Sequence, residues 1–210
     1  AEKANVDESK IKVLKQVFVV PDKVKRFEPS MKAFRTFFYP ATLKSYKNHR
    51  MLLEGAGLAK RRSAIDPKIV LTLDETEAEK VHKLKTLSIS FDLDTEFRGS
   101  ISREDVLRLY GQSILVFPSL LETVGLPLVE AKATGSIILA YDAEYSRDVL
   151  KNYSDAHFFN DANSLATLLA RCMEGQMEYA GGIEYGELNG QKWAEIVEEF
   201  AQKTHERINI

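Results

Sequence analysis

Two glutamates, Glu122 and Glu130, are separated by seven residues that include Gly125 and Pro127. Glycine allows a sharp backbone turn and proline is tolerated in the first turn of a helix, so the segment predicts a loop that opens a helix. The backbone N–H groups at this point belong to Thr123, Val124, Gly125 and Leu126. Carboxylates accept hydrogen bonds from hydroxyl groups, and free N–H groups at a helix N-terminus bind phosphate. The spacing therefore indicates a site for a ligand with a phosphate in its middle and sugars at both ends.

The elements around this segment are expected to be a strand and a helix. The apolar run at residues 113–117 is short and β-branched, which predicts a buried parallel strand. Pro118 and Ser119 end that strand, and the apolar positions Leu126, Val129 and Ala133 follow a helical spacing. A strand, a tight loop and a helix N-terminus form the usual place for an anion in an α/β fold.

The residues around the two glutamates form a longer motif, which reads P-S-L-L-E-T-V-G-L-P-L-V-E-A-K-A-T-G from Pro118 to Gly135. This motif resembles the signature of the family 4 (group 1) glycosyltransferases of the GT-B fold, where it lies in the C-terminal, nucleotide-sugar-binding domain. The resemblance covers most of residues 17–205. It implies an α/β domain built on a doubly wound, Rossmann-like parallel sheet.

The resemblance implies further donor-binding residues after two other expected strands. In the family, the loop after the first strand of this domain binds the donor diphosphate through an Arg and a Lys-Asn pair. Lys47 and Asn48 match the pair, but Thr42 stands where the Arg is expected, and Lys44 is a candidate replacement. In the family, a turn of the form F-x-G-x-(I/V) contacts the nucleotide base. The matching positions here are Gly99, Ser100 and Ile101.

These matches imply a retaining glycosyltransferase domain that binds a nucleotide-diphospho-sugar and transfers the sugar to an acceptor hydroxyl, in polysaccharide or glycoconjugate biosynthesis. Glu122 and Lys47 are the catalytic candidates: the resemblance puts Glu122 on hydroxyls of the transferred sugar and Lys47 on the diphosphate. Glu130 is expected to bind the ribose hydroxyls. The family works without a bound metal or other cofactor. The spacing of Asp92 and Asp94 is that of a metal-binding D-x-D motif, but the pair is expected to lie away from the site loops.

All of the resemblance belongs to the second half of a GT-B enzyme. We therefore expect a polar tail or linker at residues 1–16 and one donor-binding domain at residues 17–210, without the N-terminal domain that binds the acceptor. On this interpretation the isolated domain is inactive without its N-terminal half. Family grounds also allow a peripheral association of the full-length enzyme with the inner face of a membrane.

Strands are expected to alternate with helices along the chain, which predicts a parallel sheet with helices on both faces. The expected strands lie at residues 17–20, 36–39, 68–73, 113–117, 136–140 and 156–160, with a short one ending at 97–99. Helices are expected to end near Leu58 and Leu84, to begin near Ser102, Leu126, Tyr141 and Asp161, and to cover residues 191–208, where Trp193 is a packing residue. Residues 23–35 are expected to be a connector, and residues 87–96 a loop or an irregular strand. Because the carboxyl ends of parallel strands share one edge, the loops after Tyr39, Phe97 and Phe117 can converge on one crevice.

The composition agrees with one α/β core. The chain has 210 residues, 44% of them hydrophobic, and a net charge of −2 with the two signs mixed along the sequence. No charge pattern favours a nucleic-acid partner, and neither a membrane-spanning stretch nor a signal peptide is evident, so we expect a cytoplasmic protein. The single cysteine, Cys172, lies in an apolar helical pattern and is expected to be buried, and the basic run Lys60-Arg61-Arg62 is expected on the surface.

Three other interpretations are possible in principle. A non-catalytic nucleotide-sugar-binding or interaction module is favoured by Thr42 and opposed by the intact Glu122, Glu130 and Lys47. A flavodoxin-like receiver domain needs acidic residues clustered after the first strand, and the residues 40–42 are Pro, Ala and Thr. An NAD-binding domain needs a G-x-G-x-x-G motif after a strand, which the sequence lacks.

Overall fold

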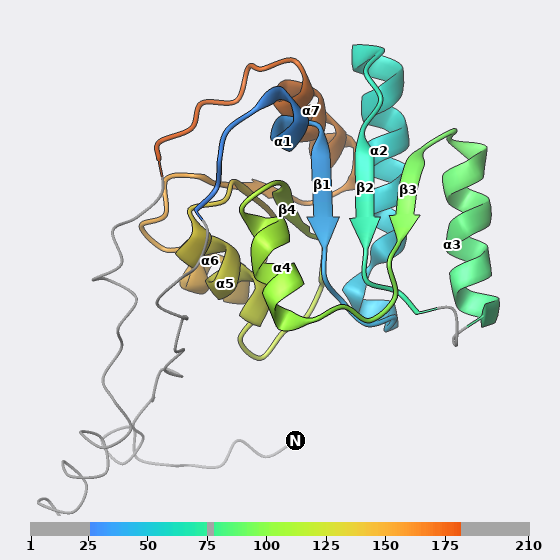
Figure 1. Cartoon of the computed structure of the whole chain (residues 1–210), viewed down its shortest axis with the longest axis horizontal. Helices are drawn as coiled ribbons and strands as arrows, with labels where there is room; N and C mark the ends of the chain where they lie inside the picture. Colours follow the sequence, from blue (N-terminus) through green and yellow to red (C-terminus); the bar gives the residue numbers. More distant parts are fainter. Residues whose placement is uncertain (1–25, 75–77, 182–210) are drawn as a thin grey trace, which may run out of the picture. The chain divides into compact units, whose positions relative to one another are not determined.

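A computed structural model describes residues 26–74 and 78–181 of the chain. The polar tail at residues 1–16, the strand at residues 17–20 and the helix at residues 191–208 that the sequence predicts lie outside the described residues, as does Trp193. Within the described part, strands and helices alternate along the chain (Figure 1).

The sheet has six strands, all parallel, in the order β3-β2-β1-β4-β5-β6. The strands are β1 (Thr36–Tyr39), β2 (Lys68–Leu71), β3 (Asp94–Phe97), β4 (Ile114–Phe117), β5 (Ile138–Tyr141) and β6 (Ala156–Phe159). The helices are α1 (Met31–Phe34), the 3₁₀ turn η2 (Ser45–Lys47), α2 (His49–Ser63), α3 (Ala78–Ser90), α4 (Arg103–Tyr110), α5 (Leu126–Thr134), α6 (Glu144–Val149) and α7 (Ala162–Met173). This strand order is that of the doubly wound, Rossmann-like fold, as the sequence predicts.

The winding of the chain reverses between β1 and β4. These two strands are neighbours in the sheet, with Phe37 opposite Ile114 and Phe38 opposite Leu115, although the chain visits β2 and β3 between them. The arrowheads of β1, β2 and β3 point to the same edge of the sheet in Figure 1. In open α/β sheets, ligands bind beyond the carboxyl ends of the strands at such a reversal point. The loops that follow β1 and β4 are therefore the ones to search for a site.

Helices cover both faces of the sheet. On one face α2 packs against α3 and α7, and on the other α5 packs against α4 and α6. Right-handed crossovers require this division, because the chain must change faces when it passes from β3 back to β4. The central strands β1 and β4 are therefore buried on both sides, which explains why they read as nearly continuous apolar runs, whereas the edge strand β3 is partly exposed and carries polar residues.

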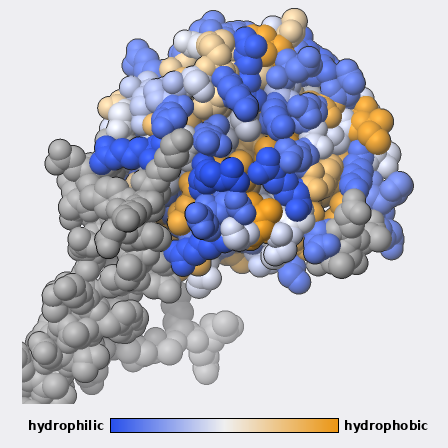
Figure 2. Space-filling model, in the orientation of Figure 1, coloured by the Kyte–Doolittle hydropathy of each residue, from blue (hydrophilic) through white to orange (hydrophobic). Residues whose placement is uncertain are grey.

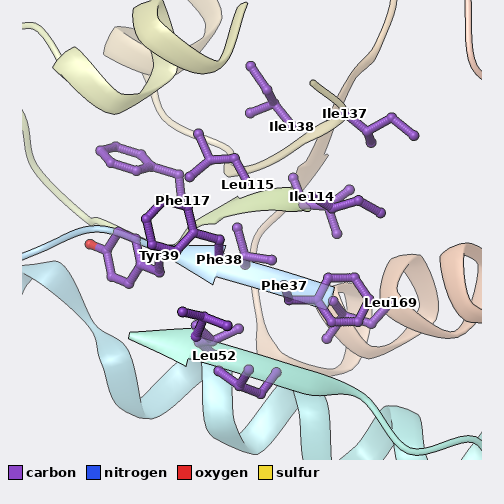
Figure 3. Close-up of a cluster of buried hydrophobic side chains, with 14 of the residues drawn as sticks. Phe37, Phe38, Tyr39, Leu52, Ile114, Leu115, Phe117, Ile137, Ile138 and Leu169 are labelled. Carbon is purple, nitrogen blue, oxygen red and sulfur yellow. The ribbon is translucent and has the colours of Figure 1, made fainter. Parts of the chain in front are cut away.

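The centre of the core lies on β1 and β4, where every residue is buried. Figure 3 shows the aromatic and aliphatic side chains that meet there. The ring of Tyr39 packs edge-on against Phe117 with 5.6 Å between centroids, and the ring of Phe38 lies 5.5 Å from that of Tyr110. The ends of β1 and β4 are thus fixed relative to each other by large aromatic contacts, and this fixes the loops that leave them.

Close packing of α2 depends on two glycines. A Cβ atom on Gly55 would lie 2.7 Å from a side-chain carbon of Leu165 on α7, and a Cβ atom on Gly57 would lie 2.4 Å from the ring of Phe91. Both separations are too short for real atoms. The two glycines therefore let the neighbouring side chains approach the backbone of α2 directly.

Two helices extend beyond their expected ends. Helix α2 runs to Ser63, past the expected end near Leu58, because the basic run finds partners along the helix surface. Lys60 pairs with Asp66 and Asp92, each at 2.8 Å. Similarly, α3 runs to Ser90 and not to Leu84. At the end of α2, one of these partners, Asp92, is distant in the sequence.

Other boundaries also differ from the sequence-based expectation. Strand β2 ends at residue 71 and β5 begins at residue 138, so both are shorter than expected. The connector at residues 23–35 contains α1, which Ser30 caps by accepting a hydrogen bond from the N–H of Ala33 at 3.1 Å. The stretch at residues 87–96 contains the end of α3 and most of β3. The predicted cap of α4 by Ser102 and the buried thiol of Cys172 are confirmed.

The surface is mainly hydrophilic on the face that Figure 2 shows, with small hydrophobic areas between polar ones. Among the described helices, none has the length and apolar character that a membrane span requires.

Candidate functional site

Lys47 and Glu122 meet at the carboxyl edge of the sheet. The ammonium Nζ of Lys47 lies 2.5 Å from Oε1 of Glu122, and the two side chains are 15% and 12% exposed. Lys47 ends η2 in the loop after β1, and Glu122 lies in the loop after β4. The structure therefore brings together the two residues that the sequence singles out as catalytic candidates, from the two loops at the reversal point.

Hydrogen bonds hold these two loops to each other. The N–H of Leu120 donates to the carbonyl of Tyr46 at 2.8 Å, and the hydroxyl of Ser119 donates to the same carbonyl at 3.3 Å. From α6, the hydroxyl of Tyr145 donates to the carbonyl of Ser119 at 2.5 Å. The segment that carries Glu122 is thus tied both to the β1 loop and to the helix beside it.

Three aromatic residues lie around Lys47, of which Tyr39 and Phe117 are buried and Tyr46 is exposed. The hydroxyl of the buried Tyr39 donates to the carbonyl of Lys47 at 2.9 Å. Burial and the nearby Glu122 carboxylate raise the pKa of this hydroxyl, so it stays protonated and remains a donor. The ammonium lies 5.5 Å from the ring centroid of Tyr46 and 6.0 Å from that of Phe117, within range of cation–π attraction. The Lys47 charge therefore occupies a defined position.

The loop then turns sharply into α2. Asn48 takes a left-handed conformation with φ 53°, and its side-chain amide lies 3.6 Å from the sulfur of Met51. The next residue, His49, is buried with its ring 4.8 Å from that of Tyr39. Burial lowers the pKa of His49 to about 4, so the imidazole is neutral at physiological pH.

The N-terminus of α5 lies directly after Glu122. Gly125 has φ 71° and ψ 58° and caps the helix without a side chain. Among the described residues, no hydrogen bond uses the N–H groups of residues 123–126. Free N–H groups at a helix start combine with the helix dipole to favour an anion, so this stretch can accept a phosphate beside the Lys47 ammonium.

A cavity of about 340 Å³ opens at the same edge of the sheet. The loops after β1, β2 and β3 and the first half of α4 line it through Pro40, Ala41, Thr42, Leu43, Thr72, Leu73, Asp74, Ser100, Ile101 and Val106. Three of the predicted donor-binding residues, Thr42, Ser100 and Ile101, are among them. Gly99 shapes the turn with φ 67°, and its N–H donates to the carbonyl of Leu73 at 3.1 Å.

The sequence does not identify the part of the cavity that follows β2. Thr72 and Leu73 were expected to belong to the strand, and Asp74 was expected to cap the next helix. The strand ends at Leu71, so all three residues lie in the loop. The shared edge of a parallel sheet is the signal that points to them, because β2 is the neighbour of β1.

Glu130 lies on α5 with 18% of its side chain exposed. The hydroxyl of Tyr110 donates to Oε2 of Glu130 at 3.3 Å, and a guanidinium nitrogen of Arg103 lies 3.3 Å from Oε1. Burial raises the pKa of the Glu130 carboxyl, while the Arg103 charge and the Tyr110 hydrogen bond oppose the shift. Both partners come from α4, and the sequence identifies neither as a site residue.

The remaining predicted residues are at the surface of the site. Thr42, Lys44 and Leu126 are exposed, and the N–H of Lys44 donates to the carbonyl of Thr42 at 3.0 Å. The exposed Thr42 carries no charge, so the position where the family has an Arg lacks a cation here. Lys44 is two residues away on the same loop.

The D-x-D pair lies away from the site loops, as predicted. Asp94 is the first residue of β3 and therefore lies at the amino edge of the sheet, and Asp92 is paired with Lys60 at that edge. Within the described ranges, no three His, Cys, Asp or Glu side chains are grouped so that they could hold a metal ion.

The chain resembles known proteins in sequence and in fold. The family model "Glycosyl transferases group 1" matches residues 22–188. No curated protein sequence matches the chain significantly. Among solved structures, the catalytic domain of the cholesterol-α-glucosyltransferase of Helicobacter pylori has 16% identity and a TM-score of 0.54 over 67% of this chain and 87% of that chain.

Two further structures were solved with nucleotides. The Anabaena protein Alr3699/HepE, in complex with UDP and glucose, has 18% identity and a TM-score of 0.59 over 72% of this chain and 42% of that chain. The pneumococcal O-GlcNAc transferase GtfA, in complex with UDP and GlcNAc, has 15% identity and a TM-score of 0.62 over 90% of this chain and 38% of that chain. At such identities the likeness concerns the fold, which is the Rossmann-like domain of GT-B glycosyltransferases. The chain matches less than half of the length of these last two proteins.

Because the family model covers most of the sequence, the chain belongs to the group 1 glycosyltransferases.

Proposed function

We propose that the chain is the donor-binding domain of a retaining glycosyltransferase that acts in polysaccharide or glycoconjugate biosynthesis. The observation that carries this proposal is the contact of Lys47 with Glu122 beside the free N–H groups of residues 123–126. A cation and a helix N-terminus suit the diphosphate of a nucleotide-sugar, and a carboxylate suits the hydroxyls of the sugar.

In the proposed reaction, the bond between the sugar and the diphosphate breaks, and the acceptor hydroxyl forms the new glycosidic bond on the same face. Negative charge grows on the departing diphosphate. The Lys47 ammonium and the N–H groups before α5 are held in place before the reaction and stabilise that charge. The departing phosphate takes the proton of the acceptor hydroxyl, so no protein nucleophile is required.

Glu122 has two functions in this proposal. Its carboxylate accepts hydrogen bonds from hydroxyls of the transferred sugar, and it also fixes the ammonium of Lys47 at 2.5 Å. The positive charges that stabilise the diphosphate come from the protein, so the reaction is proposed to need no metal.

The other end of the donor is proposed to occupy the cavity and Glu130. The base fits the cavity of about 340 Å³ that Thr42, Ser100 and Ile101 help to line, and Glu130 accepts the ribose hydroxyls. Two proteins of similar fold are described in complex with UDP and a sugar, which makes UDP the first nucleotide to test. The acceptor is proposed to bind to another domain, which the chain needs for transfer.

A non-catalytic donor-binding module is the second candidate. It is favoured by the exposed, uncharged Thr42 at the position of the Arg that the family uses on the diphosphate. Such a module would bind nucleotide-sugars and lack transferase activity even when it is joined to an acceptor-binding domain.

Calorimetric titration of the chain with UDP, GDP, ADP and dTDP tests the donor site. We expect one nucleoside diphosphate to bind, and both Lys47→Ala and Glu130→Ala to weaken it at least about tenfold, which corresponds to one charge-assisted hydrogen bond. Lys83→Ala is the control, because Lys83 is exposed on α3, pairs with Glu79, and does not line the cavity. Circular dichroism shows whether each variant is folded. A folded protein that binds none of the four nucleotides would contradict the proposal.

A further inference from the structure

The two carboxylate oxygens of Glu130 have different partners. Oε2 accepts a hydrogen bond from Tyr110, a residue with no exposed surface, and Oε1 lies beside Arg103, whose side chain is 65% exposed. The two partners are both on α4, at its last and first residues. One oxygen is therefore held by a buried side chain, and the other is paired with a side chain that is mostly exposed.

Tyr110 is a rigid partner. Its ring is packed in the core 5.5 Å from the ring of Phe38 on β1, and it ends α4 just before β4 begins. Burial and the nearby Glu130 carboxylate raise the pKa of its hydroxyl well above the usual value, so the hydroxyl remains protonated and can only donate to the carboxylate. A side chain that cannot move and cannot ionise keeps one oxygen of Glu130 in one place.

Arg103 is an exchangeable partner. Its guanidinium lies 3.3 Å from Glu130, and because the Arg103 side chain is 65% exposed, water can take the place of the carboxylate around it. A ligand hydroxyl can therefore replace Arg103 on Oε1 at small cost, whereas the buried Tyr110 cannot be replaced from solvent.

We propose that Tyr110 is a positioning residue for donor binding: its hydroxyl holds Oε2 of Glu130 so that Oε1 is presented to the ribose hydroxyls in place of Arg103. This inference rests on the proposed function, in which Glu130 binds the ribose. A carboxylate fixed before the ligand arrives does not lose rotational freedom on binding, so the hydroxyl contact gains affinity. Tyr110 thereby contributes to the preference for a nucleotide with an intact ribose, although it does not touch the ligand.

A structural role for the same hydrogen bond predicts a different result. If the contact only satisfies a buried phenol, its removal changes the stability of the fold and leaves ribose recognition unchanged. The deciding measurement is therefore the coupling between the Tyr110 hydroxyl and the ribose hydroxyls of the ligand.

The experiment compares the full chain with its Tyr110→Phe variant, which removes one oxygen atom from the core. Tyr153→Phe is the matched control, because Tyr153 is also buried and its hydroxyl donates to the carbonyl of Ser136 at 2.7 Å, away from Glu130. Calorimetry measures the binding of UDP and of its 2′-deoxy and 3′-deoxy analogues, or of the same three forms of whichever nucleoside diphosphate the chain prefers. Thermal unfolding shows that both variants are folded.

We expect Tyr110→Phe to weaken ribonucleotide binding about fivefold, which is typical of one intramolecular hydrogen bond, and to reduce the penalty for a missing ribose hydroxyl by a similar factor. The control should change neither quantity. In a Glu130→Ala background, Tyr110→Phe should have no further effect on binding, because its only route to the ligand is then absent.

Unchanged binding in Tyr110→Phe, or an equal loss for the ribonucleotide and its deoxy analogues, would overturn the inference alone. A further loss caused by Tyr110→Phe in the Glu130→Ala background would also overturn it, because Tyr110 would then act by another route. Failure of the unaltered chain to bind any nucleotide would overturn both this inference and the proposed function, so the two failures are distinguishable.

Discussion

Removal of the Lys47 ammonium is expected to lower both the stability of the fold and its affinity for nucleotides. Lys47→Met keeps most of the apolar stem and leaves the Glu122 carboxylate without its partner at 2.5 Å. Breaking a fully buried ion pair from one side costs about 3–5 kcal/mol. Because the two side chains are 15% and 12% exposed and some water reaches the carboxylate, we expect about 2–3 kcal/mol. At roughly 2–4 °C per kcal/mol for a chain of this size, the midpoint of thermal unfolding should fall by about 4–12 °C.

A double-mutant cycle separates the pair from the individual residues. Glu122→Gln and the double variant Lys47→Met/Glu122→Gln complete the cycle, and urea unfolding followed by circular dichroism gives the free energies of unfolding. The decrease in the free energy of unfolding of the double variant should be at least about 1.5 kcal/mol smaller than the sum of the decreases of the two single variants. The reason is that the second substitution removes the charge that the first left unpaired. Additive losses, within about 0.5 kcal/mol, would refute the reasoning.

An exposed ion pair provides the control for this cycle. Lys83 and Glu79 are one turn apart on α3, and the Nζ of Lys83 lies 3.0 Å from Oε1 of Glu79. Their side chains are 73% and 85% exposed. The matching substitutions, Lys83→Met and Glu79→Gln, should show a coupling of only about 0.3–0.5 kcal/mol. A coupling at Lys47 and Glu122 no larger than this would mean that burial does not strengthen the pair.

Three further outcomes are expected. Gly57→Ala should destabilise the fold by about 1–2 kcal/mol in thermal unfolding, because the added Cβ would lie 2.4 Å from the ring of Phe91 and this overpacking outweighs the higher helix propensity of alanine. Burial raises the pKa of Glu130, so nucleotide binding should be strongest above that pKa and should weaken as the pH falls through it. Because the Arg103 charge lowers this pKa, Arg103→Ala should move the loss of binding to higher pH in a calorimetric pH series. In the fold, burial lowers the pKa of His49 to about 4. The neutral imidazole therefore contributes up to about 3 kcal/mol to the free energy of unfolding above pH 6.5, and this contribution should be lost as the pH falls towards 4. His49→Phe should remove this part of the pH dependence in urea unfolding.

The fold could be predicted well where burial determines the sequence. The strands at residues 36–39 and 114–117 are buried at every position, so nearly all of their residues are apolar or aromatic and the runs were recognisable. Helix ends were less predictable. Lys60, Arg61 and Arg62 are charged whether α2 stops before them or continues, and the partner of Arg62 that supports the continuation is Asn163, 101 residues away. Local sequence does not contain this information.

The site could be predicted where it follows from the topology. Lys47 and Glu122 each follow a strand of a parallel sheet, and the shared edge of the sheet was enough to predict that their loops converge. Tyr110 was not identifiable in this way. It lies on a helix, its ring has the burial expected of a core residue, and only the position of its hydroxyl relative to Glu130 gives it a further role.

The charge balance around Lys47 predicts how the two halves of the donor depend on each other. Thr42 adds no cation, and Glu122 neutralises the ammonium of Lys47, so these residues offer a bare diphosphate little net positive charge. When sugar hydroxyls donate to Glu122, part of its negative charge is satisfied and the Lys47 ammonium becomes more available to the diphosphate. We therefore expect a nucleotide-sugar to bind more tightly than the nucleoside diphosphate alone.

Glu122→Gln should reverse this relationship. The amide holds no charge, so the ammonium faces the diphosphate without competition, and the affinity for the free nucleoside diphosphate should rise while the advantage of the sugar is lost. Calorimetry with the two ligands on both proteins measures the effect. If Glu122→Gln weakened both ligands equally, Glu122 would serve only to hold the Lys47 loop, and the sugar and the diphosphate would be recognised independently.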